Sequence, residues 1–354
     1  RSLPLRPVPG YILVMTSTPL VSVLMPCFNA AGTLPATLAS LAAQTLADFE
    51  VVAVDDGSSD ATWDVLVGFA VREPRLRPLR MEHGGIVAAL NFGLAACRAP
   101  LVARMDADDL CLPDRLAAQA ALFAADPCLA VASCRVRFGG CTRASGGYAA
   151  HVDWINTLLT HDDMARARFV EAPLAHPSAM LRRETLVRSG GYRAGRFPED
   201  YELWLRLFAA GARFAKHPDE LLVWNDPPGR LSRTHENYAQ DAFNEVKAAH
   251  LAPWLAANAA SWPGIILWGA GRESRRRAAP LLAHGARIKA YVDIDPRKVG
   301  NRIAGAPVLA RDALPEPRRI FLLTCVGSRG ARDEIGQWLD SHGWEHGAHY
   351  RHTA

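Results

Sequence analysis

Short apolar runs alternate with helix-sized stretches through the first third of the chain, and this alternation constrains the fold most strongly. Three runs have the apolar, β-branched composition of buried strands, residues 21–25, 50–54 and 101–105, and residues 77–80 are expected to form a further short strand. The stretches between them carry apolar residues at helical spacing: residues 34–46, 61–71 and 86–97. The alternation predicts a doubly wound, mainly parallel α/β sheet, in which ligands bind beyond the carboxyl ends of the strands.

The same alternation returns near the end of the chain and predicts a second domain. A length of 354 residues fits about two domains. A break at residues 261–264 precedes a new β-α-β pattern. We therefore expect a larger domain at residues 19–260 and a smaller Rossmann-like α/β domain at residues 261–354. Residues 1–18 are expected to be an N-terminal extension that comes from a tag or a misassigned start.

Charge and cysteine content exclude several classes of protein. The formal net charge is only +4, too small for the concentrated basic face of a nucleic-acid-binding protein. Seven cysteines without a Cys-x-x-Cys pair argue against a disulfide framework and favour a reducing cytoplasm. No apolar run reaches the ~18–20 residues of a membrane-spanning helix. We expect a cytoplasmic protein, with peripheral attachment to the inner membrane face left open.

The segment Asp106-Ala107-Asp108-Asp109 directly follows a predicted strand. Three carboxylates within four residues repel one another unless a cation or hydrogen-bond donors compensate. Oxygen ligands suit Mg²⁺ or Mn²⁺, which shares its remaining coordination sites with substrate phosphates. The alternative is a helix N-cap formed by Asp109 or Asp114, which would need only one aspartate. We therefore predict a metal and phosphate site here.

The segment Asp55-Asp56-Gly57-Ser58 ends another predicted strand. A carboxylate in this position can accept hydrogen bonds from a nucleobase N–H or a ribose hydroxyl. An ordinary turn followed by a helix cap explains the same residues equally well. The second acidic cluster favours the ligand-binding interpretation.

Several motifs together resemble those of family-2 glycosyltransferases with the GT-A fold. The matching segments are Val21–Asn29, Ser40–Thr45, Val54–Asp60, Asp106–Asp109 and, farther along, Glu199–Trp204. Their order and spacing are intact between residue 20 and about residue 240. The resemblance implies an inverting enzyme that takes a sugar from a nucleotide donor, usually a uridine diphosphate sugar, in the presence of Mg²⁺ or Mn²⁺.

The resemblance also implies roles for donor-side residues. Pro26 and Phe28 match the strand end that packs around the nucleobase, and Asp56 matches the residue that reads the base edge. Asp108 matches a carboxylate near the ribose, and Asp109 matches the metal ligand. The expected donor-binding set comprises Pro26, Phe28, Asn29, Asp56, Asp106, Asp108 and Arg233.

Asp200 matches the general base of the family, and Glu199 beside it is expected to raise its pKa by like-charge repulsion. Taken alone, the pair would be read as an ordinary acidic helix start. His176 and Trp224 are candidates for the acceptor side, although either residue can be purely structural. The basic loop at residues 227–235 can close over a donor, with Arg230 and Arg233 as phosphate ligands, or it can be a solvated connector.

In the second domain, Gly269-Ala270-Gly271 follows a predicted strand, and Asp293 ends the next one. This placement resembles a dinucleotide-binding turn, although the third glycine of that motif is replaced by Ser274. Two interpretations stay open. One is a nucleotide site, and the other is a packing, homodimerisation or partner-docking domain.

The sequence as a whole predicts an inverting, metal-dependent glycosyltransferase. It would move a sugar from a nucleotide-diphosphate sugar to a hydroxyl of a saccharide or lipid-linked acceptor, in bacterial cell-surface polysaccharide or glycolipid assembly. One alternative is a noncatalytic sugar-nucleotide-binding or scaffold protein. The other is a nucleotidyltransferase, which would also use carboxylates and Mg²⁺.

Overall fold

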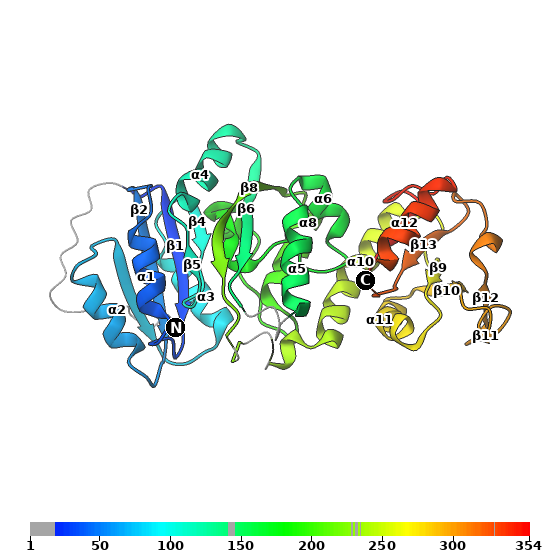
Figure 1. Ribbon diagram of the computed structural model, residues 1–354, viewed down its shortest axis with the longest axis horizontal. Helices are drawn as coiled ribbons and strands as arrows, with labels where there is room; N and C mark the ends of the chain where they lie inside the picture. The colour runs from blue at the N-terminus through cyan, green and yellow to red at the C-terminus, as the bar shows by residue number, and fades with distance from the viewer. Residues whose placement is uncertain (1–17, 141–145, 228, 231–232, 234, 329) are drawn as a thin grey trace.

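Two β-sheets lie toward opposite ends of an elongated molecule, with helix α10 (Gln240–Asn258) between them (Figure 1). The computed structural model describes residues 18–140, 146–227, 229–230, 233, 235–328 and 330–354. The expected N-terminal extension therefore lies almost entirely outside the described residues. In the part of the chain that is described, no helix combines the length and apolar character that crossing a membrane requires.

The first sheet has eight strands in the order β3-β2-β1-β4-β7-β6-β8-β5. They are β1 (Val21–Cys27), β2 (Phe49–Asp56), β3 (Leu76–Met81), β4 (Leu101–Arg104), β5 (Leu110–Cys111), β6 (Leu129–Phe138), β7 (Met180–Arg182) and β8 (Arg213–Trp224). Strands β1 to β4 run parallel, as do β6 and β8, whereas β7 and β5 pair antiparallel with their neighbours. The predicted α/β fold with a mainly parallel sheet is confirmed.

Helices cover both faces of this sheet. They are α1 (Leu34–Ala42), α2 (Thr62–Ala70), α3 (Ile86–Ala96), α4 (Arg115–Ala125), α5 (Gly146–Thr157), α6 (His161–Ala167), α7 (Arg183–Arg188) and α8 (Glu199–Ala209), with the 3₁₀ turns η1 (His176–Ser178) and η2 (Glu236–Tyr238). The helix expected at residues 34–46 ends earlier, at Ala42. Beyond it, the Gln44 side chain donates to the Leu112 carbonyl and accepts from the Leu116 N–H.

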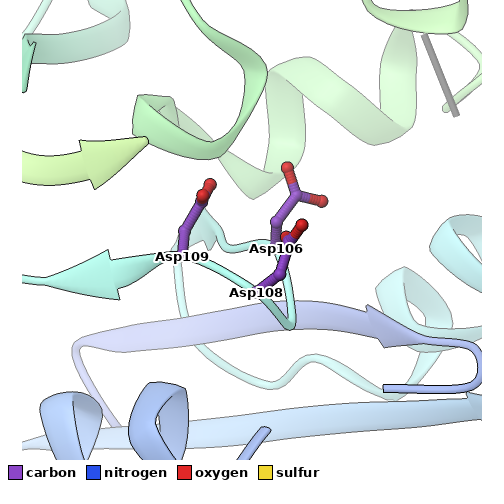
Figure 2. Close-up of side chains that lie close together, drawn as sticks. All are labelled: Asp106, Asp108 and Asp109. Carbon is purple, nitrogen blue, oxygen red and sulfur yellow. The ribbon is translucent and has the colours of Figure 1, made fainter. Parts of the chain in front are cut away.

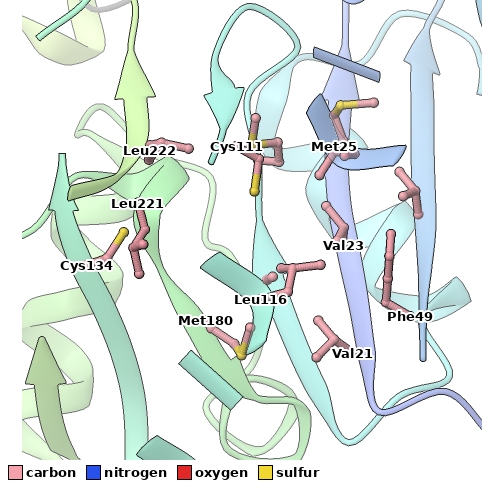
Figure 3. Packing of buried hydrophobic residues seen from close by; sticks show 14 of the residues in the cluster. Val21, Val23, Met25, Phe49, Cys111, Leu116, Cys134, Met180, Leu221 and Leu222 are labelled. Carbon is pink, nitrogen blue, oxygen red and sulfur yellow. The ribbon is translucent and has the colours of Figure 1, made fainter. Parts of the chain in front are cut away.

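Alternate residues of β1 enter two different hydrophobic cores, as the pleat of a strand requires. Val21, Val23 and Met25 pack on the side of α1 and α4, where Figure 3 shows them with Phe49 and Leu116. Leu24 faces the opposite core, with residues of α3 and α8. Burial on both faces explains why β1 and β2 read as continuous apolar runs.

The second sheet has six strands in the order β11-β12-β10-β9-β13-β14. They are β9 (Gly264–Trp268), β10 (Arg287–Val292), β11 (Arg302–Ile303), β12 (Ala306–Leu309), β13 (Phe321–Thr324) and β14 (Tyr350–His352), with helices α11 (Arg272–Ala283) and α12 (Ala331–Ser341) and the 3₁₀ turn η3 (Arg311–Ala313). Within the described residues of this unit, β11 pairs antiparallel with β12 and the other pairs are parallel. This smaller α/β unit agrees with the predicted fold, while the exact domain boundaries stay a prediction.

One hydrophobic cluster joins the two units. Tyr201 and Leu205 of α8 pack with α10, whose other contacts include Ile265 and Phe321 of the second sheet. The ammonium group of Lys247, in α10, donates to the carbonyls of Val170 at 2.9 Å and Thr353 at 2.7 Å. The helix that begins with Glu199 and Asp200 is therefore supported from the side of the second sheet.

Candidate active site

A cavity of about 1190 Å³ opens beyond the carboxyl ends of strands β1, β2 and β4. This is the position that the topology of an open α/β sheet favours for a ligand. Its walls include the segments after these strands, the start of α8, and the loop between β8 and α10. Most of the expected site residues line it: Pro26, Phe28, Asn29, Asp56, Asp106, Asp108, His176, Glu199, Asp200, Trp224 and Arg230.

At one end of the cavity, Asp56 is almost fully buried and holds the loop at residues 83–85. Its carboxylate accepts hydrogen bonds from the N–H groups of Gly84 and Gly85, at 2.8 and 2.9 Å, and lies 3.0 Å from Nδ1 of His83. The His83 ring stacks on Phe28 with 4.3 Å between ring centroids. Sequence reasoning missed His83, because its place depends on contacts with two other strand ends.

Asn29 and Gly57 shape the same corner. Asn29 lies in the left-handed region, with a φ of 49°, and its side-chain oxygen accepts from the Ser59 N–H at 2.9 Å. Gly57 has a φ of +69°, and a Cβ there would lie 2.7 Å from the backbone nitrogen of His83. A glycine is therefore required where the β2 end approaches the loop.

The three aspartates that follow β4 form a close acidic group, shown in Figure 2. Carboxylate oxygens of Asp106, Asp108 and Asp109 all lie within 4.8 Å of one another. Asp106 forms an ion pair of 2.6 Å with the buried Arg104, which sequence reasoning also missed. Asp109 accepts from the Asn225 N–H at 2.8 Å through one oxygen, whereas its other, buried oxygen has no hydrogen-bond partner among the described residues.

Electrostatics make this group a fit for a divalent cation. Burial and the negative charge of Asp106 raise the pKa of Asp108 to about 6, and the same two causes raise the pKa of Asp109 well above its ordinary value. A bound cation would reverse this destabilisation, and the set of carboxylate oxygens suits Mg²⁺ or Mn²⁺. The capping alternative has no support at either position, because Asp109 is followed by strand β5 and Asp114 makes no side-chain capping hydrogen bond at the start of α4.

Across the cavity, α8 presents Glu199 and Asp200 in its first turn. Burial opposes ionisation of Glu199, but the nearby His176 ring and the hydrogen bond from Tyr238 outweigh it and hold the Glu199 pKa below its ordinary value. Burial first, and then the charge of Glu199, raise the pKa of Asp200 to about 6. The like-charge effect expected from the sequence is present, although burial is the larger cause.

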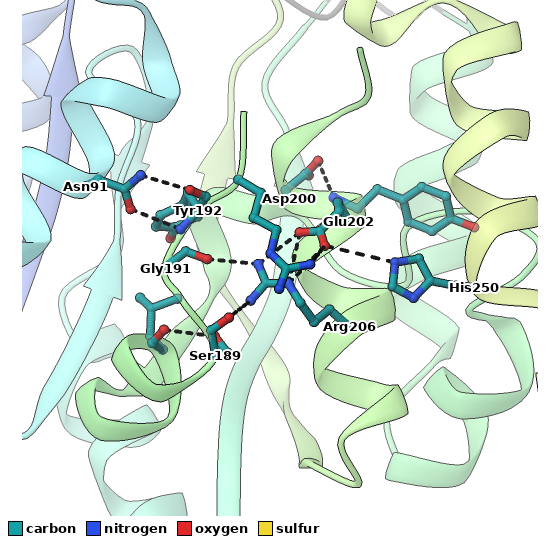
Figure 4. Close-up of polar contacts among 11 residues, drawn as sticks. Asn91, Ser189, Gly191, Tyr192, Asp200, Glu202, Arg206 and His250 are labelled. Carbon is teal, nitrogen blue, oxygen red and sulfur yellow. Dashed lines mark hydrogen bonds and ion pairs between the residues drawn. The ribbon is translucent and has the colours of Figure 1, made fainter. Parts of the chain in front are cut away.

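A buried polar network fixes this helix and the segment beside it (Figure 4). Glu202 and Arg206 form an ion pair of 2.9 Å, and Arg206 also donates to the carbonyls of Ser189 and Gly191. Asn91 of α3 pairs with both backbone groups of Tyr192, at 2.8 and 3.0 Å. The network ties α8 to α3 through the segment at residues 189–192.

The loop after β8 contributes one cation to the cavity wall. The Arg230 guanidinium lies over the rings of Trp224, at 4.3 Å, and Tyr148, at 5.1 Å. Arg233 instead pairs with Asp226 and does not line the cavity, so its expected phosphate contact stays a prediction. Four residues of the expected lid lie outside the described part of the chain: Pro228, Leu231, Ser232 and Thr234.

At the second sheet, Asp293 lies at the end of β10, beside the turn that carries Gly269 and Gly271. Its carboxylate accepts from the N–H groups of Ala270, at 3.1 Å, and Asp295, at 3.0 Å, and pairs with Lys298 at 3.0 Å. Burial opposes its ionisation, but these hydrogen bonds prevail and lower its pKa.

Comparisons with known proteins agree on one family. Residues 22–190 match the family model described as Glycosyl transferase family 2. The chain is 31% identical over 189 residues to the amylovoran biosynthesis glycosyltransferase AmsE of Erwinia amylovora, which covers 52% of this chain and 67% of that protein. It is 30% identical over 196 residues to an uncharacterized glycosyltransferase of Haemophilus influenzae, with coverages of 55% and 70%.

More distant similarities point the same way. The O-antigen biosynthesis glycosyltransferase WbnJ of Escherichia coli is 25% identical, with 53% of this chain and 71% of that protein covered. The crystal structure of S. aureus TarS 1–349 in complex with UDP-GlcNAc has a TM-score of 0.52 at 19% identity, over 75% of this chain and 72% of that one. That last likeness is one of fold.

Proposed function

Because the chain belongs to glycosyltransferase family 2 and has its GT-A fold, we propose that it is an inverting, metal-dependent enzyme that transfers a sugar from a nucleotide-diphosphate sugar to a hydroxyl acceptor. The observation that carries this proposal is that two acidic groups of different character lie on one cavity. Asp108 lines the cavity and belongs with Asp109 to the acidic group suited to a cation, whereas Asp200, also in the cavity wall, is suited to a proton.

For the donor, we propose that the base lies against Phe28 and His83 and that the diphosphate lies toward Asp108 and Arg230. Asp109 and Asp108 would hold the Mg²⁺ or Mn²⁺ ion. When bound, such an ion supplies positive charge that offsets the charge developing on the leaving diphosphate. Arg230 would add a guanidinium on the same side, and the cavity walls would exclude water from the reacting centre.

For the acceptor, Asp200 would remove the hydroxyl proton as the new bond forms to the anomeric carbon. The bond from that carbon to the diphosphate oxygen breaks in the same displacement, so the products are a glycoside with inverted configuration, a nucleoside diphosphate and protonated Asp200. A pKa of about 6 makes Asp200 a carboxylate at neutral pH and a stronger base than an exposed aspartate. His176 and Trp224 would face the acceptor.

The relatives named for amylovoran and O-antigen biosynthesis support a role in building bacterial cell-surface polysaccharide. We propose a UDP-sugar as the donor and a saccharide or lipid-linked sugar as the acceptor. Donor hydrolysis is the simplest test, because water replaces the unidentified acceptor. A panel of UDP-, GDP- and dTDP-sugars is incubated with Mn²⁺, with Mg²⁺ or with a chelator, and nucleoside diphosphate is measured.

The Asp200→Asn variant separates binding from chemistry. Its amide cannot accept the acceptor proton, so we expect turnover to fall by roughly 10²-fold or more while nucleotide affinity barely changes. Near-normal turnover would remove Asp200 from the mechanism. Release of pyrophosphate instead of nucleoside diphosphate would indicate a nucleotidyltransferase, and nucleotide binding without any turnover would indicate a noncatalytic protein.

A further inference from the structure

Glu199, beside the proposed base Asp200, belongs to a buried chain of polar groups that includes two tyrosines without a role in the proposed reaction. Nδ1 of His176 lies 3.6 Å from Glu199, and Nε2 of the same ring lies 3.2 Å from the Tyr192 hydroxyl. From the opposite direction, the Tyr238 hydroxyl donates to Glu199 at 2.5 Å. Tyr192, His176 and Glu199 are each at most 6% exposed.

We propose that Tyr192 and Tyr238 are positioning residues that act on the general base through Glu199, with Tyr192 working by way of His176. The two phenols hold Glu199 as the ionised member of the pair and leave Asp200 as the member that takes the proton. The inference rests on the proposed general-base role of Asp200.

Tyr192 supports the tautomer of His176 that carries its proton toward Glu199. A neutral imidazole donates through one nitrogen and accepts through the other. Because the Glu199 carboxylate beside Nδ1 can only accept, it favours the tautomer with the proton on Nδ1, and Nε2 is then left to accept from the Tyr192 hydroxyl. Without the hydroxyl, the ring can present an unprotonated Nδ1 to a carboxylate, which repels it. The Asn91 side chain donates to the Tyr192 carbonyl and accepts from the Tyr192 N–H, so the backbone that carries this phenol is held in place.

Tyr238 acts on Glu199 directly and from another part of the chain. It lies in η2, after the basic loop that carries Arg230, and lines the cavity. A hydrogen bond to a charged acceptor is stronger than one between neutral groups, so the Tyr238 contact is expected to matter more than the Tyr192 contact. The loop that bears a proposed phosphate ligand is thereby connected to the proposed base.

Several charged groups around Glu199 and Asp200 influence the pKa values that a pH–rate profile would measure. Asp200 is influenced by Glu199, His176 and Arg104, and it accepts the Tyr201 N–H at 2.7 Å. Glu199 is influenced by His176 and Tyr238, and Asp106 lies close enough to affect Tyr238. Removing a donor from Glu199 makes protonation of the pair easier, so the first proton is taken up at a higher pH.

Two isosteric variants test the inference: Tyr238→Phe and Tyr192→Phe. The rate of donor hydrolysis is measured between pH 4.5 and 8, at saturating UDP-sugar and Mn²⁺, with the sugar that the wild-type protein hydrolyses fastest. For Tyr238→Phe we expect a roughly 10-fold loss of turnover. We also expect the acid limb of the pH–rate profile, where the rate falls as the base is protonated, to move to higher pH by roughly one unit. Tyr192→Phe should move the limb in the same direction by less, and UDP affinity should stay within about 2-fold in both.

Tyr201→Phe is the matched control. Tyr201 follows Asp200 in the same helix and is fully buried, but its hydroxyl donates to the Arg168 carbonyl, away from Glu199. This variant should lower the unfolding temperature without moving the acid limb.

The possible failures are distinguishable. An unmoved acid limb in Tyr238→Phe, with Asp200→Asn inactive, would overturn the inference and leave the proposed function standing. An acid limb moved equally by Tyr201→Phe would also overturn it, because the effect would then reflect packing alone. Absence of any donor hydrolysis by the wild-type protein would overturn the proposed function, and this inference with it.

Discussion

Both sheets place aspartates directly after a strand, but the two sets of carboxylates have opposite surroundings. After β4, Asp108 and Asp109 crowd one another, and their pKa values are raised by burial and by Asp106. After β10, Asp293 is satisfied by two backbone N–H groups and Lys298, and its pKa is lowered. Among the described residues, the carboxyl end of a strand therefore carries a carboxylate with an oxygen that lacks a hydrogen-bond donor in the first sheet, and one whose donors come from the protein itself in the second.

This difference indicates that the end of β4 is better suited to a ligand than the end of β10. A carboxylate that lacks donors gains stability from a cation, whereas a carboxylate that already has donors must lose them to accept a ribose. The G-x-G turn resembles a nucleotide site, but its acidic partner already holds the N–H of Ala270 within that turn. The structure thus favours, for the second unit, the packing role over the nucleotide role.

The largest expected effect tests whether that packing role is essential. We expect a chain ending at Ala260 to lose cooperative folding, because α10 would expose the apolar residues that now meet Ile265 and Phe321. The ammonium group of Lys247 would also lose the Thr353 carbonyl. The measurement is soluble yield and thermal unfolding beside the full chain.

A soluble shortened chain that unfolds cooperatively and binds UDP with Mn²⁺ would contradict this expectation. It would show that the first sheet is stable alone and that the shared cluster contributes little. The domain boundary predicted near residue 260 would then also mark a boundary of folding.

The next effect compares the two strand ends directly through Asp109→Asn and Asp293→Asn. We expect Asp109→Asn to lose roughly 10²-fold in metal-dependent turnover, since a neutral amide is a weaker cation ligand. In chelator at neutral pH it should unfold at a higher temperature than the wild-type protein, because the buried charge repulsion is removed. Asp293→Asn should keep its turnover.

A calorimetric titration of each protein with Mn²⁺, without nucleotide, provides a check that is independent of activity. Unchanged Mn²⁺ affinity in Asp109→Asn would show that Asp109 is not a ligand of the cation. Loss of turnover in Asp293→Asn would erase the contrast between the two sheets.

The parts of the fold that rest on local patterns could be read from the sequence. Strands β1, β2 and β4 are buried on both faces, so their apolar runs were plain, and the aspartates followed at their ends. Strand β8 was missed because the segment His217-Pro218-Asp219-Glu220 interrupts its apolar pattern, where its pairing with β6 also shifts register. Proline and acidic residues argue against a strand unless the tertiary pairing overrides them.

The site divides in the same way. Acidic residues next to a strand end could be found by position, but their partners could not. Arg104, Asn225 and Tyr238 act on carboxylates through contacts whose chemistry depends on side-chain direction or on segments far apart in the chain. Arg104 looked like one more residue of an apolar strand, and only its burial beside Asp106 reveals its charge-balancing place.

The smallest expected effect concerns the stability contribution of Asp293. We expect Asp293→Asn to destabilise the protein by about 1 kcal/mol at pH 7, because the amide keeps one acceptor oxygen but loses the pair with the partly exposed Lys298. The pKa of Asp293 is lower in the folded state than in the unfolded chain, so ionisation stabilises the fold above an unfolded value near 3.9. That contribution is lost as the pH falls through the lower, folded-state value.

Urea unfolding at pH 7 and at pH 3 tests this directly, since the two proteins should differ at neutral pH and converge in acid. Asp312→Asn is the matched control, because Asp312 is exposed and its pair with Arg311 lies in the same unit. A second arm adds NAD⁺, NADP⁺ or UDP. The contrary outcome is that one of them raises the unfolding temperature of the wild-type protein but not that of Asp293→Asn. That result would show that the Asp293 carboxylate contacts the nucleotide and that the end of β10 is a nucleotide site.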